Sequence, residues 1–153
     1  MKDNCEDLFL TFSFSCYYTI RGDFVNIKYE DLFKEEDGLL SISRDDFRCV
    51  TNGKDIFYKI ININKKVDAV SEIKKSFEKE TLHKKSNIAI VYIESKDNLT
   101  LMEQSRMIEA IRELYEDEDE EKFIDLNVIY GCAINDRLTC DIKITYLSST
   151  IDE

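Results

Sequence analysis

The chain has 153 residues, 43% of them hydrophobic, and a formal net charge of −11. That negative charge argues against a nucleic-acid-binding face and against an anionic membrane as the partner, because both require a basic surface. Proline is absent and only four residues are glycine, so no linker is visible and one domain over residues 1–153 is expected. Five cysteines without a Cys-x-x-Cys pair are typical of reduced thiols in a cytoplasmic protein.

The first 21 residues have the alternation of a β-strand. Apolar side chains share one parity from Leu8 to Ile20, and Thr and Ser fill most of the other parity. Residues 21–23, Arg-Gly-Asp, predict a turn. The next stretch, residues 24–32, fits either a short strand or a loop that leads into a helix. Residues 29–37 predict about two helical turns that end at Gly38.

The middle of the chain predicts two strands and a helix. Residues 39–43 fit a further strand, followed by a turn at Asn52 and Gly53, and residues 56–63 form a stronger strand candidate. A helical stripe then runs through Ala69, Val70, Ile73 and Phe77, with Asp68 placed to cap the helix.

A second strand and helix follow. Residues 86–94 are apolar at both parities, which indicates an interior strand. Thr100 and Glu103 have the spacing of a capping box and begin a helix. Its apolar face is predicted to contain Leu101, Met107 or Ile108, Ile111, and Leu114 or Tyr115. The acidic run 116–121 ends this helix and is interpreted as a solvated connection, because consecutive carboxylates lack the spacing of calcium ligands.

Two strands close the chain. Residues 126–134 are apolar at both parities and predict an interior strand, whereas residues 140–147 alternate and predict one face in water. Asn135, Asp136 and Arg137 supply a turn between them, so the two strands are expected to form an antiparallel pair. The order β-α-β-α-β-β from residue 56 predicts an α+β fold, a two-layer sandwich in which helices pack on a mixed sheet.

No residue set in the sequence has the pattern of a catalytic, cofactor or metal site. His83 is the only histidine and is interpreted as a surface residue, and Cys132 and Cys140 are interpreted as core thiols. Motifs for hydrolases and metalloproteases do not occur. We therefore expect no enzyme activity, no cofactor and no metal in this chain.

Six stretches between residues 22 and 148 carry a family resemblance: GDFVNIKYEDLF, IFYKIININKKVDAVSEIKKSF, IAIVYIE, DNLTLMEQSRMIEAI, NVIYGCAIND and DIKITYL. Through these stretches the sequence resembles the C-terminal domain of the FtsZ/tubulin family of polymerising GTPases. The resemblance implies the α+β fold of that domain. Residues 38–54 look like an insertion relative to the family's usual connection at this point.

The sequence also departs from this family. The family binds GTP in a separate N-terminal domain through consecutive glycines, whereas the glycines here are isolated at 22, 38, 53 and 131. In the family's inter-subunit loop, an Asn and two acids act on the neighbouring subunit's GTP. Asn26 matches the Asn and Asp31 the second acid, but Lys28 replaces the first acid. The alternative is that Asn26 is a turn residue and Asp31 an acid facing a helix dipole.

Three functions remain open at this point. The leading hypothesis is a non-enzymatic protein-interaction module that binds or caps a tubulin-like cell-division filament, or that pairs with itself, through Asn26, Lys28 and Asp31. The first alternative is the C-terminal portion of a divergent GTPase whose nucleotide-binding domain is separate. The second is a small-molecule-binding or catalytic oligomer, which rests on analogy of fold alone.

Overall fold

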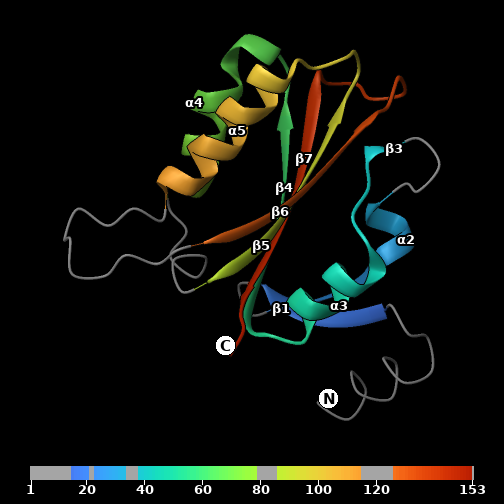
Figure 1. Cartoon of the computed structure of the whole chain (residues 1–153), viewed down its shortest axis with the longest axis vertical. Helices are drawn as coiled ribbons and strands as arrows, with labels where there is room; N and C mark the ends of the chain where they lie inside the picture. Colours follow the sequence, from blue (N-terminus) through green and yellow to red (C-terminus); the bar gives the residue numbers. More distant parts are fainter. Residues whose placement is uncertain (1–14, 21–22, 34–37, 79–85, 115–125, 153) are drawn as a thin grey trace.

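The computed structural model describes residues 15–20, 23–33, 38–78, 86–114 and 126–152 (Figure 1). Its elements, in chain order, are β1 (Ser15–Ile20), β2 (Asp23–Lys28), α2 (Tyr29–Leu32), β3 (Gly38–Leu40), α3 (Arg44–Thr51), β4 (Lys54–Ile63), η1 (Lys66–Asp68), α4 (Ala69–Phe77), β5 (Ile88–Ser95), α5 (Leu101–Glu113), β6 (Asn127–Ile134) and β7 (Ile142–Thr150). The first 14 residues, His83 and the acidic run 116–121 lie outside the described residues.

The main sheet has five strands in the order β3-β6-β5-β7-β4. β5 runs parallel to β6 and antiparallel to β7, while β3 and β4 are antiparallel edge strands. The predicted α+β fold, a mixed sheet with helices packed on it, is confirmed. The expected antiparallel pairing of the two last strands is wrong, because β6 and β7 flank β5 instead of pairing with each other. A tight hairpin at residues 135–137 is therefore replaced by a connection that passes the end of β5.

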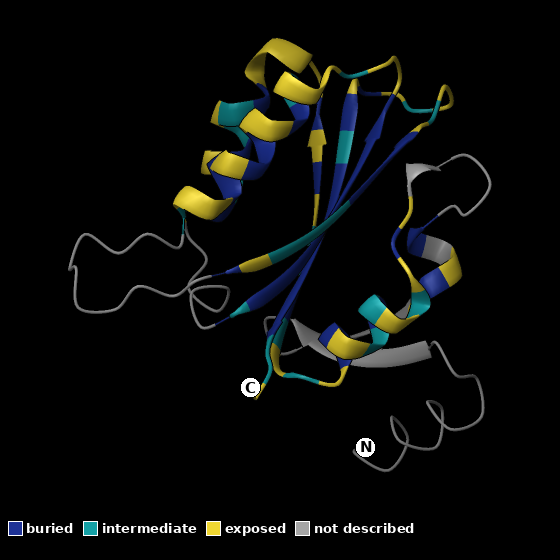
Figure 2. Cartoon of the chain, viewed as in Figure 1, coloured by how far each residue is buried: buried dark blue, intermediate teal, exposed yellow. Residues whose placement is uncertain are grey.

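β5 is the centre of the fold, and all eight of its residues are buried, as its two apolar faces predict. Ala89, Val91 and Ile93 face one core cluster together with α4 and α5. Ile88 and Ile90, with Tyr92, face a second cluster with α2 and α3. Helices therefore cover both faces of the sheet, α4 and α5 on one side and α2 and α3 on the other, so the predicted two layers are three (Figures 1 and 2).

β6 is an interior strand only in part. Its partner β3 pairs with Cys132 and Ala133, which are buried, and does not reach the first half of β6. Val128, Ile129 and Tyr130 are consequently half-buried. The expectation that the whole strand is covered on both sides was wrong for this half, because one short edge strand protects only the end of β6 that it pairs with.

β7 differs from its predicted alternation. Of the residues expected in water, Asp141 is exposed and Lys143 is half-buried, but Thr145 is buried, as are Leu147 and Ser149 farther along the same face. This face lies under α3, a helix that the sequence interpretation missed, and the Ser149 hydroxyl donates to the Val50 carbonyl at 2.6 Å. A strand can therefore alternate in polarity and still be central, provided that its hydroxyl groups find partners.

α3 lies within residues 38–54, which the sequence interpretation treated as an insertion with one strand and a turn. Ser43 begins the helix by accepting a hydrogen bond from the Asp46 amide at 3.0 Å. Phe47 and Val50 are 1% and 0% exposed and belong to the second core cluster. The segment thus supplies core residues and an additional helix as well as the short strand β3.

The two helices on the other face begin differently. Thr100 and Glu103 form the predicted capping box, with both hydrogen bonds at 3.1 Å. Asp68 precedes α4, but its side chain caps nothing, because residues 66–68 already form a 3-10 turn. Leu101 was expected on the buried face of α5, and this was wrong, because its side chain is 77% exposed.

β1 and β2 form a separate antiparallel two-stranded sheet in which Ile20 pairs with Asp23. The predicted strand over the described residues 15–20 and the chain reversal after it are therefore confirmed. The helix expected over residues 29–37 is one turn, Tyr29–Leu32. Among the described residues, no helix is long and apolar enough to cross a membrane.

Candidate interaction site

The candidate site lies where β2 ends and α2 begins. Residues 24–28 form a strand paired with β1, so the loop expected from the family resemblance is replaced by a strand that enters the helix directly. Lys28 is the last strand residue, has extended backbone angles and is exposed. The Phe33 amide closes the single helical turn by donating to the Tyr29 carbonyl at 3.0 Å. The chain therefore changes direction within one residue of Lys28.

Tyr29 fixes this junction to the rest of the fold. It is 2% exposed, and its hydroxyl donates a hydrogen bond to the Ile42 carbonyl just before α3. Its ring lies 5.1 Å from the Phe33 ring and 5.8 Å from the Phe47 ring, measured between centroids. Phe33 in turn meets Tyr92 of the central strand β5 edge-on at 5.1 Å. Aromatic packing of this kind holds the backbone after Lys28 against α3 and the sheet.

Arg44 contributes a charged hydrogen bond and a cation–π contact at the surface of the same junction. Its Nη1 donates to Glu30 Oε1 at 2.7 Å, and its guanidinium carbon lies 4.5 Å from the centre of the Tyr29 ring. This hydrogen bond is the main reason that the pKa of Glu30 is lowered from its ordinary value, and the charges of Arg44 and Lys28 also contribute. Glu30 is therefore an ionised carboxylate that is already engaged by a cation.

The structure brings the three predicted site residues into one short segment. Asn26 and Lys28 are two residues apart on β2 and therefore belong to the same face of that strand, and Asp31 is the third residue of α2. Asn26 pairs with Tyr17 in the register of the two-stranded sheet, so the alternative interpretation of Asn26 as a turn residue was wrong. The side chains of Asn26 and Asp31 lie outside what the structure describes.

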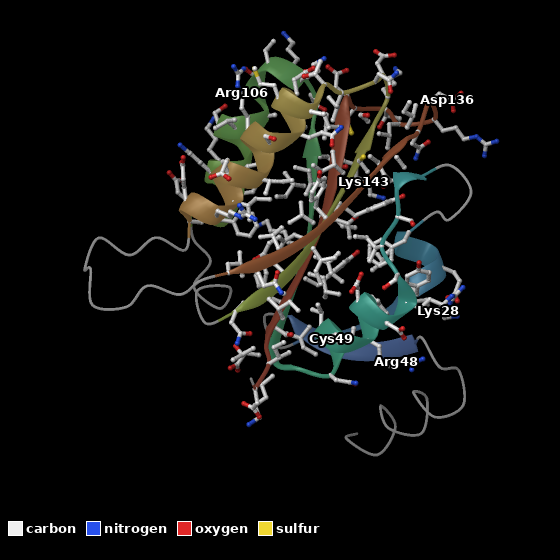
Figure 3. The ribbon with its side chains drawn as sticks, viewed as in Figure 1. Lys28, Arg48, Cys49, Arg106, Asp136 and Lys143 are labelled. Carbon is white, nitrogen blue, oxygen red and sulfur yellow. The ribbon has the colours of Figure 1, made fainter. Side chains whose placement is uncertain are left out.

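Lys28 is the described member of this set, and Figure 3 shows it beside α2 and α3. Within the described residues its ammonium forms no ion pair, although its charge acts on Glu30. An exposed ammonium next to a fixed one-turn helix can pair with an anionic oxygen of a partner. The acidic residue nearest in sequence, Glu30, is bound to Arg44.

Sequence reasoning missed Arg44 and Glu30 as parts of this surface. The missed signal was Ser43 followed three residues later by Asp46, a helix start that would have placed Arg44 in the first turn of α3. The other candidates do not form a site. Cys132 and Cys140 are buried, as predicted for core thiols. Over the described ranges, no group of three or more His, Cys, Asp or Glu side chains could hold a metal ion.

Comparison with known proteins gives a likeness of fold. No protein-family model and no curated sequence matches the chain. Among solved structures, a point mutant of FtsZ from M. jannaschii superposes with a TM-score of 0.55 and 16% identity, covering 76% of this chain and 34% of that chain. An empty FtsZ dimer from the same organism gives a TM-score of 0.53 and 16% identity, covering 76% and 33%.

The chain thus spans about a third of the FtsZ chains that it matches. The resemblance found in the sequence is supported independently by the coordinates, since 76% of this chain superposes on FtsZ with TM-scores of 0.55 and 0.53. At 16% identity the likeness concerns the fold and carries no activity with it. The chain has the α+β fold of the FtsZ C-terminal domain.

Proposed function

We propose that this chain is a non-enzymatic interaction domain that binds a subunit of a tubulin-like GTPase, or a filament of such subunits, through the β2–α2 junction. The observation that carries the proposal is the exposed Lys28 at the start of a helix fixed by Tyr29 and Arg44. In the family that the chain resembles, this segment reaches the neighbouring subunit's nucleotide. Lys28 stands there in place of an acid.

The presence of Lys28 at a position where the family has an acid favours capping over hydrolysis. A carboxylate at this position would help to orient and activate the attacking water. An ammonium instead pairs with a phosphate oxygen, so it strengthens contact with a nucleotide and supplies no base. A domain of this kind would add to the end of a filament and slow the loss of the terminal phosphate.

The test is a pull-down with a tubulin-like GTPase from the same cell, combined with an assay of GTP turnover. Lys28→Glu should weaken binding at least tenfold, because it places a carboxylate against a phosphate. Lys65→Glu is the matched control, since Lys65 is also exposed but lies just before η1. Lys28→Asp should weaken capping and raise the partner's turnover where the remaining geometry is kept. Equal binding by wild type and Lys28→Glu would place the interface elsewhere.

A second candidate function is favoured because this chain covers only about a third of each FtsZ chain that it matches. Here the chain is the C-terminal portion of a divergent GTPase, and a separate nucleotide-binding domain completes it. In that case a Gly-rich protein encoded by the same cell would form a stable equimolar complex with this chain and bind GTP only as the complex. Analytical size exclusion of the mixed proteins separates this outcome from transient capping.

A further inference from the structure

A cavity of about 300 Å³ lies on the face of the molecule that carries α4 and α5, between the beginnings of these two helices. Its floor is apolar and consists of Ala69, Val70, Leu99, Met107 and Ile142. Figure 3 places Arg106, on its rim, at the opposite end of the molecule from Lys28. The cavity is therefore separate from the junction proposed to bind a GTPase.

Large apolar side chains are exposed on the wall of this cavity and at the start of α5, the helix that supplies part of its lining. Val67, on its wall, is 88% exposed, and Leu101 and Met102 at the start of α5 are 77% and 64% exposed. The Met102 sulfur lies 3.4 Å from Nη2 of Arg106 and so continues the rim. Single exposed apolar residues are ordinary, but several of them beside an apolar cavity mark a surface that another molecule covers.

The charges on the rim favour an acidic partner. Lys66 Nζ lies 2.6 Å from Glu103 Oε2, so that Lys66 is neutralised by a carboxylate that also takes part in the capping box. Arg106 forms no ion pair with any carboxylate in the described ranges, and its Nη2 donates to the Met102 sulfur. An arginine that pairs with no carboxylate of the described ranges thus stands beside an apolar cavity.

We propose that this cavity is the docking site for an acidic, amphipathic segment of a partner protein. One large apolar side chain of the segment fills the cavity, and a neighbouring carboxylate forms a bidentate pair with Arg106. A protein segment fits better than a small molecule, because Leu101 and Met102 lie outside the cavity and only an extended partner covers them. Methionine and arginine are also enriched at the centres of protein interfaces.

The test uses a defined probe and fluorescence anisotropy. The probe is a fluorescein-labelled 12-residue helical peptide with leucines at helical spacing on one face and glutamates beside them. An isomer with lysines in place of the glutamates is the charge control. The acidic peptide should bind the full chain with a Kd on the order of 10–100 μM, as a small interface does. The lysine isomer should bind at least tenfold more weakly.

Point variants test whether the peptide binds at the cavity rim or elsewhere on α5. Arg106→Glu and Met102→Asp should each weaken the acidic peptide about tenfold without lowering the melting temperature, because both side chains are exposed. Arg112→Glu is the matched control on the same helix, where Arg112 is exposed and paired with Glu109. It should leave binding unchanged.

Three results would overturn the proposal. The first is equal binding of the acidic peptide to wild type and Arg106→Glu. The second is a loss of affinity for this peptide in Arg112→Glu as large as the loss in Arg106→Glu. The third is binding of decanoate, a small carboxylate with an alkyl chain, in an Arg106-dependent manner while the acidic peptide does not bind. That result would identify the cavity as a small-molecule site.

Discussion

Arg44 and Glu30 are 14 residues apart in the chain, and a 2.7 Å hydrogen bond between them joins the first turn of α3 to the single turn of α2. The same guanidinium covers the ring of Tyr29. The segment that carries Lys28 is therefore held from two sides, by aromatic packing beneath it and by this ion pair at the surface.

Glu30→Gln tests the surface part of this arrangement. The side chains of Arg44 and Glu30 are 36% and 55% exposed, so the pair is expected to contribute only about 0.5 kcal/mol to the free energy of unfolding. The pKa of Glu30 is lowered in the fold, so this contribution is present above the ordinary value of 4.5 and is lost as the pH falls through the lowered value. Urea denaturation at pH 7 and pH 3 should show a larger difference between variant and wild type at pH 7 than at pH 3. A difference of the same size at both pH values would contradict the assignment.

Thr100→Ala and Asp68→Ala form a matched pair at the starts of α5 and α4. Thr100 accepts the Glu103 amide, and its loss should cost about 1 kcal/mol of unfolding free energy. The Asp68 side chain makes no capping hydrogen bond, so Asp68→Ala should change stability by less than about 0.5 kcal/mol. Thermal denaturation of both variants checks the prediction, and equal losses would show that Asp68 caps its helix after all.

Ile90→Ala and Ile129→Ala compare the centre of the sheet with the uncovered half of β6. The two residues are paired in the register of β5 and β6, but Ile90 is 0% exposed and Ile129 is half-buried. The cavity left by Ile90→Ala should lower the free energy of unfolding by about 2–5 kcal/mol. Ile129→Ala should lower it clearly less, because the space left by its side chain opens to water. Chemical denaturation gives both values. A larger loss for Ile129 would mean that further residues cover β6.

Gly53→Ala probes a close approach between the turn after α3 and the last strand. A Cβ at residue 53 would lie 2.3 Å from the Ser149 hydroxyl oxygen and 2.9 Å from the Thr150 carbonyl oxygen. One neighbour is backbone, so the clash cannot be relieved by a side-chain rotation alone, and a loss of about 1–3 kcal/mol is expected. Chemical denaturation again measures the loss, and Ser149→Gly in the same chain should recover part of it. A neutral Gly53→Ala would show that the turn can move.

Much of the fold was predictable from side-chain periodicity. β5, with apolar residues on both faces, and α5, with its capping box, follow from local sequence. The order of β6 and β7 does not, because both strands suit either side of β5 and the choice depends on packing between distant segments. α3 was missed since its eight residues, Arg44–Thr51, are mostly polar and only Phe47 and Val50 mark its buried face.

The candidate site was predictable only in part, because it too depends on contacts between segments that are distant in the sequence. Asn26, Lys28 and Asp31 were identified through a family resemblance, and their spacing in sequence kept them together. The partner of Glu30 lies on α3, so no local pattern around residue 28 could reveal that Arg44 holds the junction. The cavity between α4 and α5 also combines residues from three separate stretches, 66–70, 99–107 and 142.

The central claim is that Lys28 faces a partner's nucleotide, and the most direct measurement is the effect of that nucleotide on binding. The affinity of this chain for a tubulin-like GTPase from the same cell is measured by titration calorimetry, with the GTPase either empty or loaded with a non-hydrolysable GTP analogue. We predict that wild type binds the loaded form at least tenfold more tightly and that Lys28→Met removes this preference. Equal affinity of wild type for both forms, or an unchanged preference in Lys28→Met, would contradict the account.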